Sequence, residues 1–399
     1  MPTFWALLLA LAIFMCAGLV VLSAGLPTDL RENSNDLSLY REAGESMLGG
    51  EIPYNDFFIE YPPGSLPAFI PPAVFSASRD GYADAFAFEM AILLAVTLVL
   101  TALTARRLYG LRHAFLAAGT FVAAALSLYP VAVTRYDAVV ALALGLGALF
   151  ATLGGRFVLL AYASLGLGAA AKLVPALALL PLALTRRSTT LGLTTFVATV
   201  SLFFAPFILL GGRGLLEGFA YQAERGLQVE SLAASVLIPL RSLGGVTFEY
   251  GAFEVYGGGA GLAASLSPLL TIVLLTLTGF VMYRRYRRFG RLGAEAFPAY
   301  AAALILAFML GSKVLSPQYV IWLLPLIPLG ARGAAGVAVC AVFLAACFAT
   351  TQVFPIHYDD LLAFSYPGPE LLLARNILLV ALWVSMLVLP TMARERSTR

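Results

Sequence analysis

Two carboxylates stand at the ends of one polar stretch that separates long apolar runs. Residues 34–63 read SNDLSLYREAGESMLGGEIPYNDFFIEYPP, with Asp36 near the start and Glu60 near the end. A carboxylate can take a proton from an acceptor hydroxyl, so Asp36 could act as a general base, and Glu60 could bind substrate. Asp36 could equally be a helix cap, because Ser34 and Asn35 precede it and apolar residues follow at helical spacing. Glu60 could instead simply begin a helix, where acidic residues are favoured.

The same stretch predicts an amphipathic helix followed by a turn and a second helix. One face of the first helix carries Leu37, Tyr40, Gly44, Met47 and Leu48. Gly49–Gly50 would end this helix, which could lie in the membrane interface. Pro53–Tyr54 favours an extended turn, and Glu60–Tyr61–Pro62–Pro63 places proline in the first turn of the next helix. Carboxylates above an interfacial helix suit a substrate whose tail lies in lipid and whose phosphate lies at the interface.

Four charged side chains elsewhere are candidates for binding that phosphate or a sugar. Lys172 and Lys313 each lie at a predicted outer helix end beside a proline-containing turn. They could hold phosphate, or they could extend to lipid headgroups. Arg135 and Asp137 flank Tyr136, and they could form a local ion pair or contact the substrate.

A further group of polar residues lies in the second long polar segment and in the last one. Arg225, Gln228 and Glu230 could contact the donor or the acceptor, or could order their own loop. His357, beside two aspartates, is expected to hydrogen-bond sugar or phosphate. The other histidine, His113, is predicted at the opposite side of the membrane, so no two-histidine metal site is expected.

The amino-acid composition indicates whether the chain folds in water or in a lipid membrane. Of the 399 residues, 60% are hydrophobic and 12% are charged, whereas a soluble domain is about 45–50% apolar and about 25% charged. The polar residues are too few to cover the apolar surface of a water-soluble protein of this size. A spanning helix needs about 20 mostly apolar residues, and such runs recur along the whole chain. The sequence therefore predicts an all-α, polytopic integral membrane protein.

Arginine clusters orient the predicted helices, because basic residues remain cytoplasmic. Placing all clusters inside gives about twelve spans and puts both termini in the cytoplasm. The clusters are Arg106/Arg107/Arg112, Arg156, Arg186/Arg187, Arg284/Arg285/Arg287/Arg288/Arg291, Arg332 and Arg394/Arg396/Arg399. The spans are 4–25, 83–104, 113–130, 137–153, 156–171, 172–185, 189–211, 263–283, 294–311, 317–330, 333–351 and 370–391. Nearly all acidic residues then fall on the outer side, which suggests that the polar chemistry occurs there.

Two features of this arrangement bear on the site. The apolar run 156–185 is predicted to break at Lys172, three residues before Pro175, because an unbroken helix would place its flanking arginines on opposite sides. The outer segments 26–82 and 212–262 are the long ones, and they would form the mouth of an active site on a single transmembrane domain, 1–399. Gly257–Gly258–Gly259 is predicted to be a flexible bend.

Three ordered motifs resemble glycosyltransferase family 87, whose members are polyprenyl-phosphate-mannose-dependent mannosyltransferase-like proteins of the GT-C superfamily. The first is the run from Asp36 to Pro63, the second is RGLQVESL at 225–232, and the third is SKVLSPQYVIWLLPL at 312–326. With the Lys172–Leu173–Val174–Pro175 element, the resemblance covers nearly the whole chain.

The resemblance implies a GT-C-like helical bundle with interfacial helices in the first outer loop. It implies inverting transfer of a hexose, with mannose expected, from a polyprenyl-phosphate donor to a lipid-linked or glycan acceptor in a bacterial plasma membrane. Asp36 matches the catalytic aspartate of the family. The expected substrate-binding residues are Glu60, Tyr61, Arg135, Asp137, Lys172, Arg225, Gln228, Glu230, Lys313, Gln318 and His357. No cofactor, metal or nucleic acid is expected.

A multi-pass transporter or lipid flippase is the alternative class, since either could have twelve spans. Transporters usually place ionisable groups near the bilayer midplane at broken helices. Here most predicted spans have apolar interiors and the polar residues gather on one face, which favours chemistry on one side of the membrane.

Overall fold

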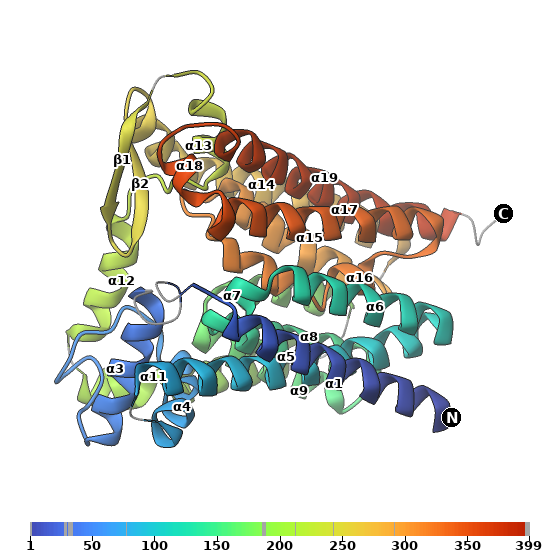
Figure 1. The fold of residues 1–399 in the computed structure, drawn as a ribbon. Coiled ribbons are helices and arrows are strands. Elements are labelled where there is room, and N and C mark those ends of the chain that lie inside the picture. Colours follow the sequence, from blue (N-terminus) through green and yellow to red (C-terminus); the bar gives the residue numbers. More distant parts are fainter. Residues whose placement is uncertain are drawn as a thin grey trace.

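Long helices in one bundle dominate the computed structural model of the chain (Figure 1). The structure describes residues 2–27, 30, 35–76, 78–185, 189–211, 213–241, 243–290 and 292–395. The predictions for Ser34, Arg186/Arg187, Arg291 and Arg396/Arg399 concern positions outside these described residues. The first and last described helices both have their free ends at the end of the bundle opposite the short elements (Figure 1).

Six described helices are long and apolar enough to cross a membrane. They are α1 (Pro2–Ala24), α5 (Arg79–Tyr109), α11 (Thr189–Leu210), α14 (Ala260–Phe289), α17 (Gly333–Thr351) and α19 (Gly368–Glu395). Four shorter α-helices and one composite segment are also apolar. They are α6 (Leu111–Ser127), α8 (Asp137–Leu153), α9 (Phe157–Ala171), α15 (Ala296–Gly311), and η2 (Val174–Ala178) continued by α10 (Leu179–Thr185). The positions agree with the predicted spans, while the number twelve stays a prediction.

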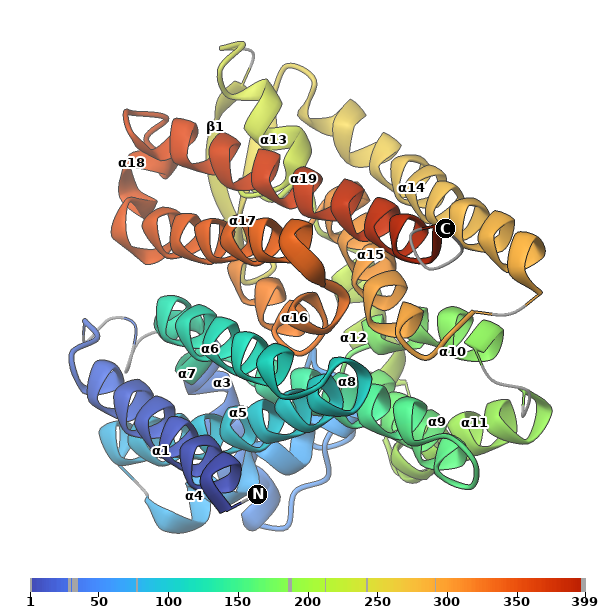
Figure 2. The ribbon, with the colours of Figure 1, turned by 90° about the vertical axis from the view of Figure 1, so that its right-hand side faces the viewer.

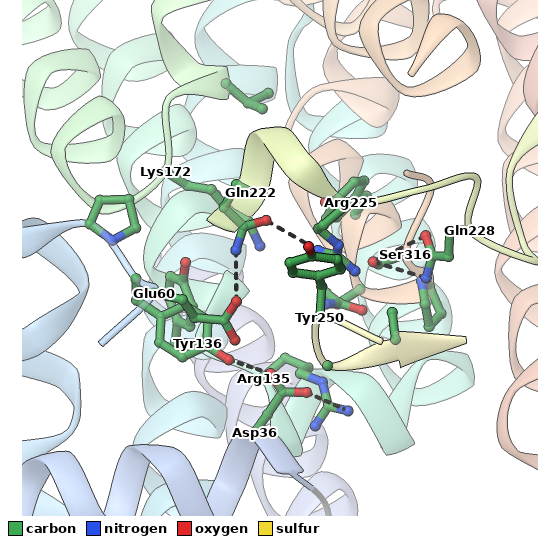
Figure 3. A pocket seen from close by; sticks show the side chains of 18 of the residues that line it. Asp36, Glu60, Arg135, Tyr136, Lys172, Gln222, Arg225, Gln228, Tyr250 and Ser316 are labelled. Carbon is green, nitrogen blue, oxygen red and sulfur yellow. Dashed lines mark hydrogen bonds and ion pairs between the residues drawn. The ribbon is translucent and has the colours of Figure 1, made fainter. Parts of the chain in front are cut away.

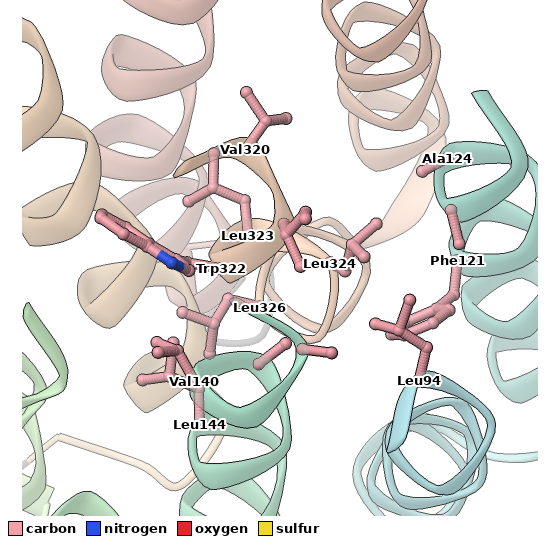
Figure 4. Packing of buried hydrophobic residues seen from close by; sticks show 14 of the residues in the cluster. Leu94, Phe121, Ala124, Val140, Leu144, Val320, Trp322, Leu323, Leu324 and Leu326 are labelled. Carbon is pink, nitrogen blue, oxygen red and sulfur yellow. The ribbon is translucent and has the colours of Figure 1, made fainter. Parts of the chain in front are cut away.

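The predicted span 317–330 is not one helix. It consists of a 3-10 helix, η3 (Pro317–Leu323), followed by the short α16 (Ile327–Gly330). Seen along the bundle, α1 and α5–α9 lie in one group and α14–α19 in another (Figure 2). The segment from Val320 to Leu326 fills the space between the groups, where its side chains meet Val140 and Leu144 of α8 (Figure 4). These side chains are fully buried, so η3 is a central part of the core and not a peripheral span.

Threonine hydroxyl groups inside an apolar helix form their hydrogen bonds within the same helix. In α5, Thr97, Thr101 and Thr104 each donate a hydrogen bond of 2.7–2.8 Å to a carbonyl oxygen four residues earlier. This bonding removes the cost of an unpaired polar group in an apolar surrounding. The α5 helix can therefore carry buried threonines without a polar partner from another helix.

The first outer segment folds largely as its sequence predicts. An amphipathic helix, α3 (Asn35–Leu48), carries Asp36 in its first turn and is followed by Gly49–Gly50. Gly50 has a φ of 91°, which glycine adopts without strain. Pro62 then caps the 3-10 helix η1 (Pro63–Ala68), which precedes α4 (Ile70–Phe75). A Cβ on Gly64 would lie 2.4 Å from the carbonyl carbon of Ala170, so only glycine lets η1 approach the end of α9 this closely.

The second outer segment corrects the all-α prediction. It contains α12 (Gly214–Glu224) and α13 (Leu232–Leu237), and then an antiparallel hairpin of β1 (Leu243–Glu249) and β2 (Ala252–Gly257). Tyr250 and Gly251 form its two-residue turn, with φ angles of 49° and 70°. Such a turn matches the twist of a hairpin. The bend predicted at Gly257–Gly259 is present, since Gly257 and Gly259 both have positive φ angles before α14 begins.

The remaining short elements complete the same end of the bundle. They are α7 (Tyr129–Thr134), η4 (Gln352–Ile356) and α18 (Tyr358–Leu362). Together with α3, α12, α13 and the hairpin, they gather at the end opposite the free ends of α1 and α19 (Figure 1). The polar segments of the sequence are thus brought to one face.

Candidate active site

A cavity of about 530 Å³ opens among the short elements at this end of the bundle. Its size falls within the range of small-molecule sites, about 300–1,000 Å³. Nine of the twelve predicted site residues line it: Asp36, Glu60, Tyr61, Arg135, Lys172, Arg225, Gln228, Glu230 and Gln318. Segments that are far apart in the sequence therefore supply one polar chamber (Figure 3).

Both carboxylate oxygens of Asp36 have partners. Oδ2 lies 2.9 Å from Nη2 of Arg135, and Oδ1 accepts a hydrogen bond of 2.5 Å from the hydroxyl of Tyr61. A carboxylate offers about four lone-pair positions, so these two bonds leave capacity for a substrate hydroxyl. Arg135 therefore pairs with a residue of the first outer segment, and the alternative of a local ion pair between Arg135 and Asp137 is wrong.

Aromatic rings fix the tyrosine that holds Asp36. The ring of Tyr61 contacts Tyr40, Phe69 and Tyr136 edge-on, with centroid distances of 5.2–5.9 Å. Burial raises the pKa of Tyr61 well above its ordinary value, and the nearby Asp36 carboxylate raises it further. Tyr61 therefore remains a proton donor to Asp36 at neutral pH.

Lys172 occupies the break between α9 and η2. Its φ of −162° and ψ of 125° are extended, so the helix ends here as predicted. Its ammonium lies 2.8 Å from Oδ1 of Asp137. It also lies 5.0–5.1 Å from the ring centres of Tyr136, Tyr319 and Trp322. Cation–π attraction and the ion pair together stabilise a cation at this depth.

Asp137 does not line the cavity, but it contacts two residues that do, Lys172 and Trp322. Only 1% of its side chain is exposed, and the indole nitrogen of Trp322 donates a 2.6 Å hydrogen bond to the same Oδ1 that binds Lys172. Asp137 therefore orients Lys172 and Trp322 together. A direct contact between Asp137 and a substrate in the cavity would need rearrangement.

Three polar side chains of the cavity wall, Glu60, Gln222 and Arg225, are linked in a row by hydrogen bonds (Figure 3). The side-chain nitrogen of Gln222 donates to Oε2 of Glu60 at 2.8 Å, and Nη1 of Arg225 donates to Oε1 of Gln222 at 3.2 Å. Burial raises the pKa of Glu60 to about 7, with a further contribution from the charge of Asp36. Glu60 can therefore be present in both protonation states near neutral pH.

Gln228 joins two of the polar motifs that the sequence singled out. It is buried, and its Oε1 accepts a 2.8 Å hydrogen bond from the backbone nitrogen of Leu315. Its own backbone nitrogen donates to the carbonyl of Lys313 at 3.0 Å. The neighbouring Val229 donates to the carbonyl of Phe253 in β2 at 2.9 Å. Gln228 thus ties the 312–316 stretch and the hairpin to one cavity wall.

Glu230 is a buried carboxylate with a buried counter-charge. It is 1% exposed, and its Oε2 lies 3.6 Å from Nη1 of Arg375, whose side chain is 0% exposed. Nη2 of Arg375 also donates to the carbonyl oxygen of Glu230 at 2.5 Å. Burial raises the pKa of Glu230 to about 7 even though Arg375 lowers it. Arg375 therefore holds the loop that carries Glu230 through both backbone and side chain.

Besides Asp137, two other predicted site residues, Lys313 and His357, lie outside the cavity walls, and each has internal partners. The ammonium of Lys313 donates to the carbonyl oxygens of Ala223 and Arg225. Nδ1 of His357 lies 2.9 Å from Oδ2 of Asp360. In the part of the chain that the structure describes, no group of three His, Cys, Asp or Glu side chains could hold a metal ion.

Several residues of the site were not predicted from the sequence. Tyr136, Gln222 and Tyr250 line the cavity, and Arg375 supports it from α19. A signal existed for Arg375, because Arg375 and Asn376 interrupt an apolar run, and charged residues in spans are usually functional or structural. No comparable signal marked Gln222, which lies on α12, a short helix with few polar residues.

The chain was compared with known families, curated proteins and solved structures. No curated protein sequence matches the chain. Among solved structures, ArnT from Cupriavidus metallidurans in the apo state superposes with a TM-score of 0.49 at 14% sequence identity, covering 95% of this chain and 78% of that one. The family model of glycosyltransferase family 87 matches residues 58–317, which is more than half of the chain. The chain therefore belongs to glycosyltransferase family 87, and it is a membrane glycosyltransferase.

Proposed function

We propose that the protein transfers a hexose, with mannose the expected sugar, from a polyprenyl-phosphate donor to a lipid-linked or glycan acceptor. The transfer takes place at the outer face of a bacterial plasma membrane, and it inverts the anomeric centre. The observation that carries this proposal is the position of Asp36. Its carboxylate faces a cavity that also contains cations for a phosphate and apolar walls for a lipid.

The cavity wall contains both cationic and apolar side chains, as a polyprenyl-phosphate donor requires. Lys172 and Arg225 supply positive charge, while Leu173, Leu215 and Phe308 supply apolar surface. A phosphate would be attracted to the cations, and the adjoining prenyl units would contact the apolar side chains. The tail could then continue into lipid from between the helices.

The reaction is a single displacement. Asp36 takes the proton of an acceptor hydroxyl, and the oxygen attacks the anomeric carbon on the face opposite the phosphate. The bond between that carbon and the phosphate oxygen breaks, and polyprenyl phosphate leaves with the additional negative charge. Lys172 and Arg225 stabilise that charge. Lys313 orders the carbonyl oxygens next to Arg225 and thereby positions its guanidinium.

The positions of two arginines support the proposed orientation in the membrane. The guanidinium of Arg106 lies 4.6 Å from the ring centre of Phe4, close to the start of α1, and the guanidinium of Arg332 lies 5.8 Å from that of Tyr109. Phe4 lies in the first turn of α1, whose N-terminus is at the end of the bundle opposite the hairpin (Figure 1). Since basic residues remain cytoplasmic, we place both termini inside and the cavity outside.

The deciding experiment is sugar transfer by purified protein in nanodiscs. Radiolabelled polyprenyl-phosphate mannose and a lipid-extract acceptor are supplied to the wild type, to Asp36→Asn and to Asp56→Asn. Asp56 is an exposed carboxylate of the same outer segment that lies outside the cavity walls. We expect Asp36→Asn to lower kcat by at least about 100-fold, the usual contribution of a general base, and Asp56→Asn to resemble the wild type.

Two outcomes would contradict the proposal. Equal transfer by the wild type and a folded Asp36→Asn variant would remove Asp36 from the mechanism. Absence of transfer with any polyprenyl-phosphate sugar, together with substrate-dependent uptake into proteoliposomes, would support the transporter or flippase alternative.

A further inference from the structure

A second, smaller cavity lies beside the first and shares a wall with it. Its volume is about 260 Å³, and it lies between α3 and residues 57–61, with Tyr221 of α12 at its edge. We name it the side pocket. Ile59, Glu60 and Tyr61 line both the side pocket and the main cavity, so a group bound in the side pocket would reach the main cavity past these three side chains.

The two cavities differ in charge. The main cavity contains Arg135, Lys172 and Arg225. Among the described residues that line the side pocket there is no Lys or Arg, and two of them are the carboxyl-bearing Glu42 and Glu60. An ionised phosphate would be repelled by such a lining, whereas neutral hydroxyl groups could donate to its carboxylates. The side pocket therefore favours an uncharged, hydroxyl-rich group.

Aromatic surface accompanies these polar groups. The ring of Phe58 is 5.7 Å from that of Tyr221, which in turn meets the ring of Tyr250 edge-on at 5.0 Å. Phe58 is 53% exposed, so part of its ring is available to a ligand. Rings of this kind combine a large apolar surface with a polar edge. They suit a cyclic polyol, which presents C–H groups on its faces and hydroxyls around its rim.

The position of the side pocket connects it to the proposed base. Tyr61, in the shared wall, donates its hydrogen bond to Oδ1 of Asp36. Glu60, in the same wall, is held by Gln222. With a pKa of about 7, Glu60 can either donate a hydrogen bond to a ligand hydroxyl or accept one from it. A ring bound beside this wall would contact Tyr61, the side chain that also holds Asp36.

We propose that the side pocket is the acceptor subsite, and that it binds an uncharged sugar ring or cyclic polyol headgroup. This inference rests on the proposed function, because it assigns the donor phosphate to the main cavity and the acceptor ring to its neighbour. It also narrows the acceptor class, since a phosphate group of the acceptor would have to lie outside the side pocket.

The kinetic test varies donor and acceptor independently in the wild type, Ser46→Leu and Phe58→Ala. Ser46 lines the side pocket and is absent from the walls of the main cavity, so a leucine there reduces the side pocket alone. We expect the KM for the acceptor to rise about tenfold, which corresponds to about 1.4 kcal/mol. The KM for the donor, and hydrolysis of the donor without acceptor, should change less than about twofold. Tyr256→Leu is the matched control, because Tyr256 is 52% exposed and lines neither cavity.

A binding measurement separates this inference from the proposed function. Saturation-transfer NMR with a neutral methyl hexoside should show binding to the wild type and loss of binding to Ser46→Leu, while the same hexose as a phosphate should not compete at the side pocket. Binding that is unchanged in Ser46→Leu, or a change confined to the KM for the donor, would overturn the acceptor subsite. Specific binding at the side pocket by a protein that transfers no sugar would retain the side pocket and overturn the proposed function.

Discussion

The hydroxyl of Tyr61 and Oδ1 of Asp36 are 2.5 Å apart, and this hydrogen bond joins the start of α3 to the segment that leads into η1. Arg135 binds the other oxygen of the same carboxylate at 2.9 Å. Two donors from two separate parts of the chain therefore fix the direction in which Asp36 faces the cavity. The orientation of the proposed base thus depends on side chains that are not themselves bases.

Replacing Tyr61 by phenylalanine tests that dependence. A hydrogen bond to a charged group contributes about 1.5–3 kcal/mol, so we expect Tyr61→Phe to lower kcat by about tenfold with little change in the donor KM. Initial rates with both substrates measure the effect. Tyr82→Phe is the control, since Tyr82 hydrogen-bonds the carbonyl of Phe69 and lies outside the cavity walls. A wild-type kcat in Tyr61→Phe would show that Arg135 alone orients Asp36.

The ion pair between Lys172 and Asp137 predicts that a double variant lacking both charges regains stability without regaining activity. Asp137→Leu leaves a cation among aromatic rings without its counter-charge, and losing one partner of a buried pair costs about 3–5 kcal/mol. We expect a lower Tm in detergent for Asp137→Leu, and recovery of much of that loss in Lys172→Met/Asp137→Leu. The double variant should nevertheless remain deficient in transfer, because it lacks the cation for the leaving phosphate. Full activity of the double variant would exclude Lys172 from phosphate binding.

Glu60 predicts a pH dependence of stability. Its pKa is about 7 in the folded protein and about 4.3 in an unfolded chain. Between these values the unfolded state binds fewer protons, so the stability that Glu60 contributes is complete at low pH and is lost as the pH rises through about 7. We expect Glu60→Gln to reduce the decline of Tm between pH 5 and pH 8. The exposed Glu51→Gln should keep the wild-type slope, and an unchanged slope in Glu60→Gln would show that Glu60 is ionised throughout.

Arg375 predicts a large structural effect from a residue outside the cavity walls. Its side chain is 0% exposed and is the charged partner of the equally buried Glu230, so Arg375→Met should destabilise the protein by about 3–5 kcal/mol. Arg375→Lys should rescue little, because an ammonium cannot reproduce the contacts of a guanidinium. Thermal unfolding measures both, with the exposed Arg79→Met as control. A Tm within a degree of wild type in Arg375→Met would show that Glu230 is neutral without its partner.

Local signals in the sequence predicted the elements that carry most of the site. The break at Lys172 followed from charge placement and a nearby proline, and α3 followed from its apolar spacing and terminal glycines. These features depend on residues within one or two turns of each other. The family motifs likewise pointed to segments that the structure brings to one cavity.

Features that depend on distant partners were not predictable in the same way. The sequence offered Asp137 as a local partner of Arg135, yet the structure pairs Arg135 with Asp36, about a hundred positions earlier. The hairpin was missed because its turn is Tyr250–Gly251 and lacks the Asn-Gly or Asp-Gly signal. Its strands are also stabilised by contacts with residues 227–229, which no local pattern reveals.

Three proline-containing 3-10 helices begin beside the cavity, which Pro62, Leu173 and Ser316 line. The helices η1, η2 and η3 each carry proline at the first or second position, and they directly follow Pro62, Leu173 and Ser316. The fixed φ of proline reduces the freedom that these walls would lose on binding. The cavity is also lined by α12 and the hairpin, where few side chains are buried. The side of the site with the proline-containing helices is therefore restrained before a substrate binds, and the side with α12 and the hairpin is less restrained. The conformational entropy lost on substrate binding should then come mainly from the second outer segment.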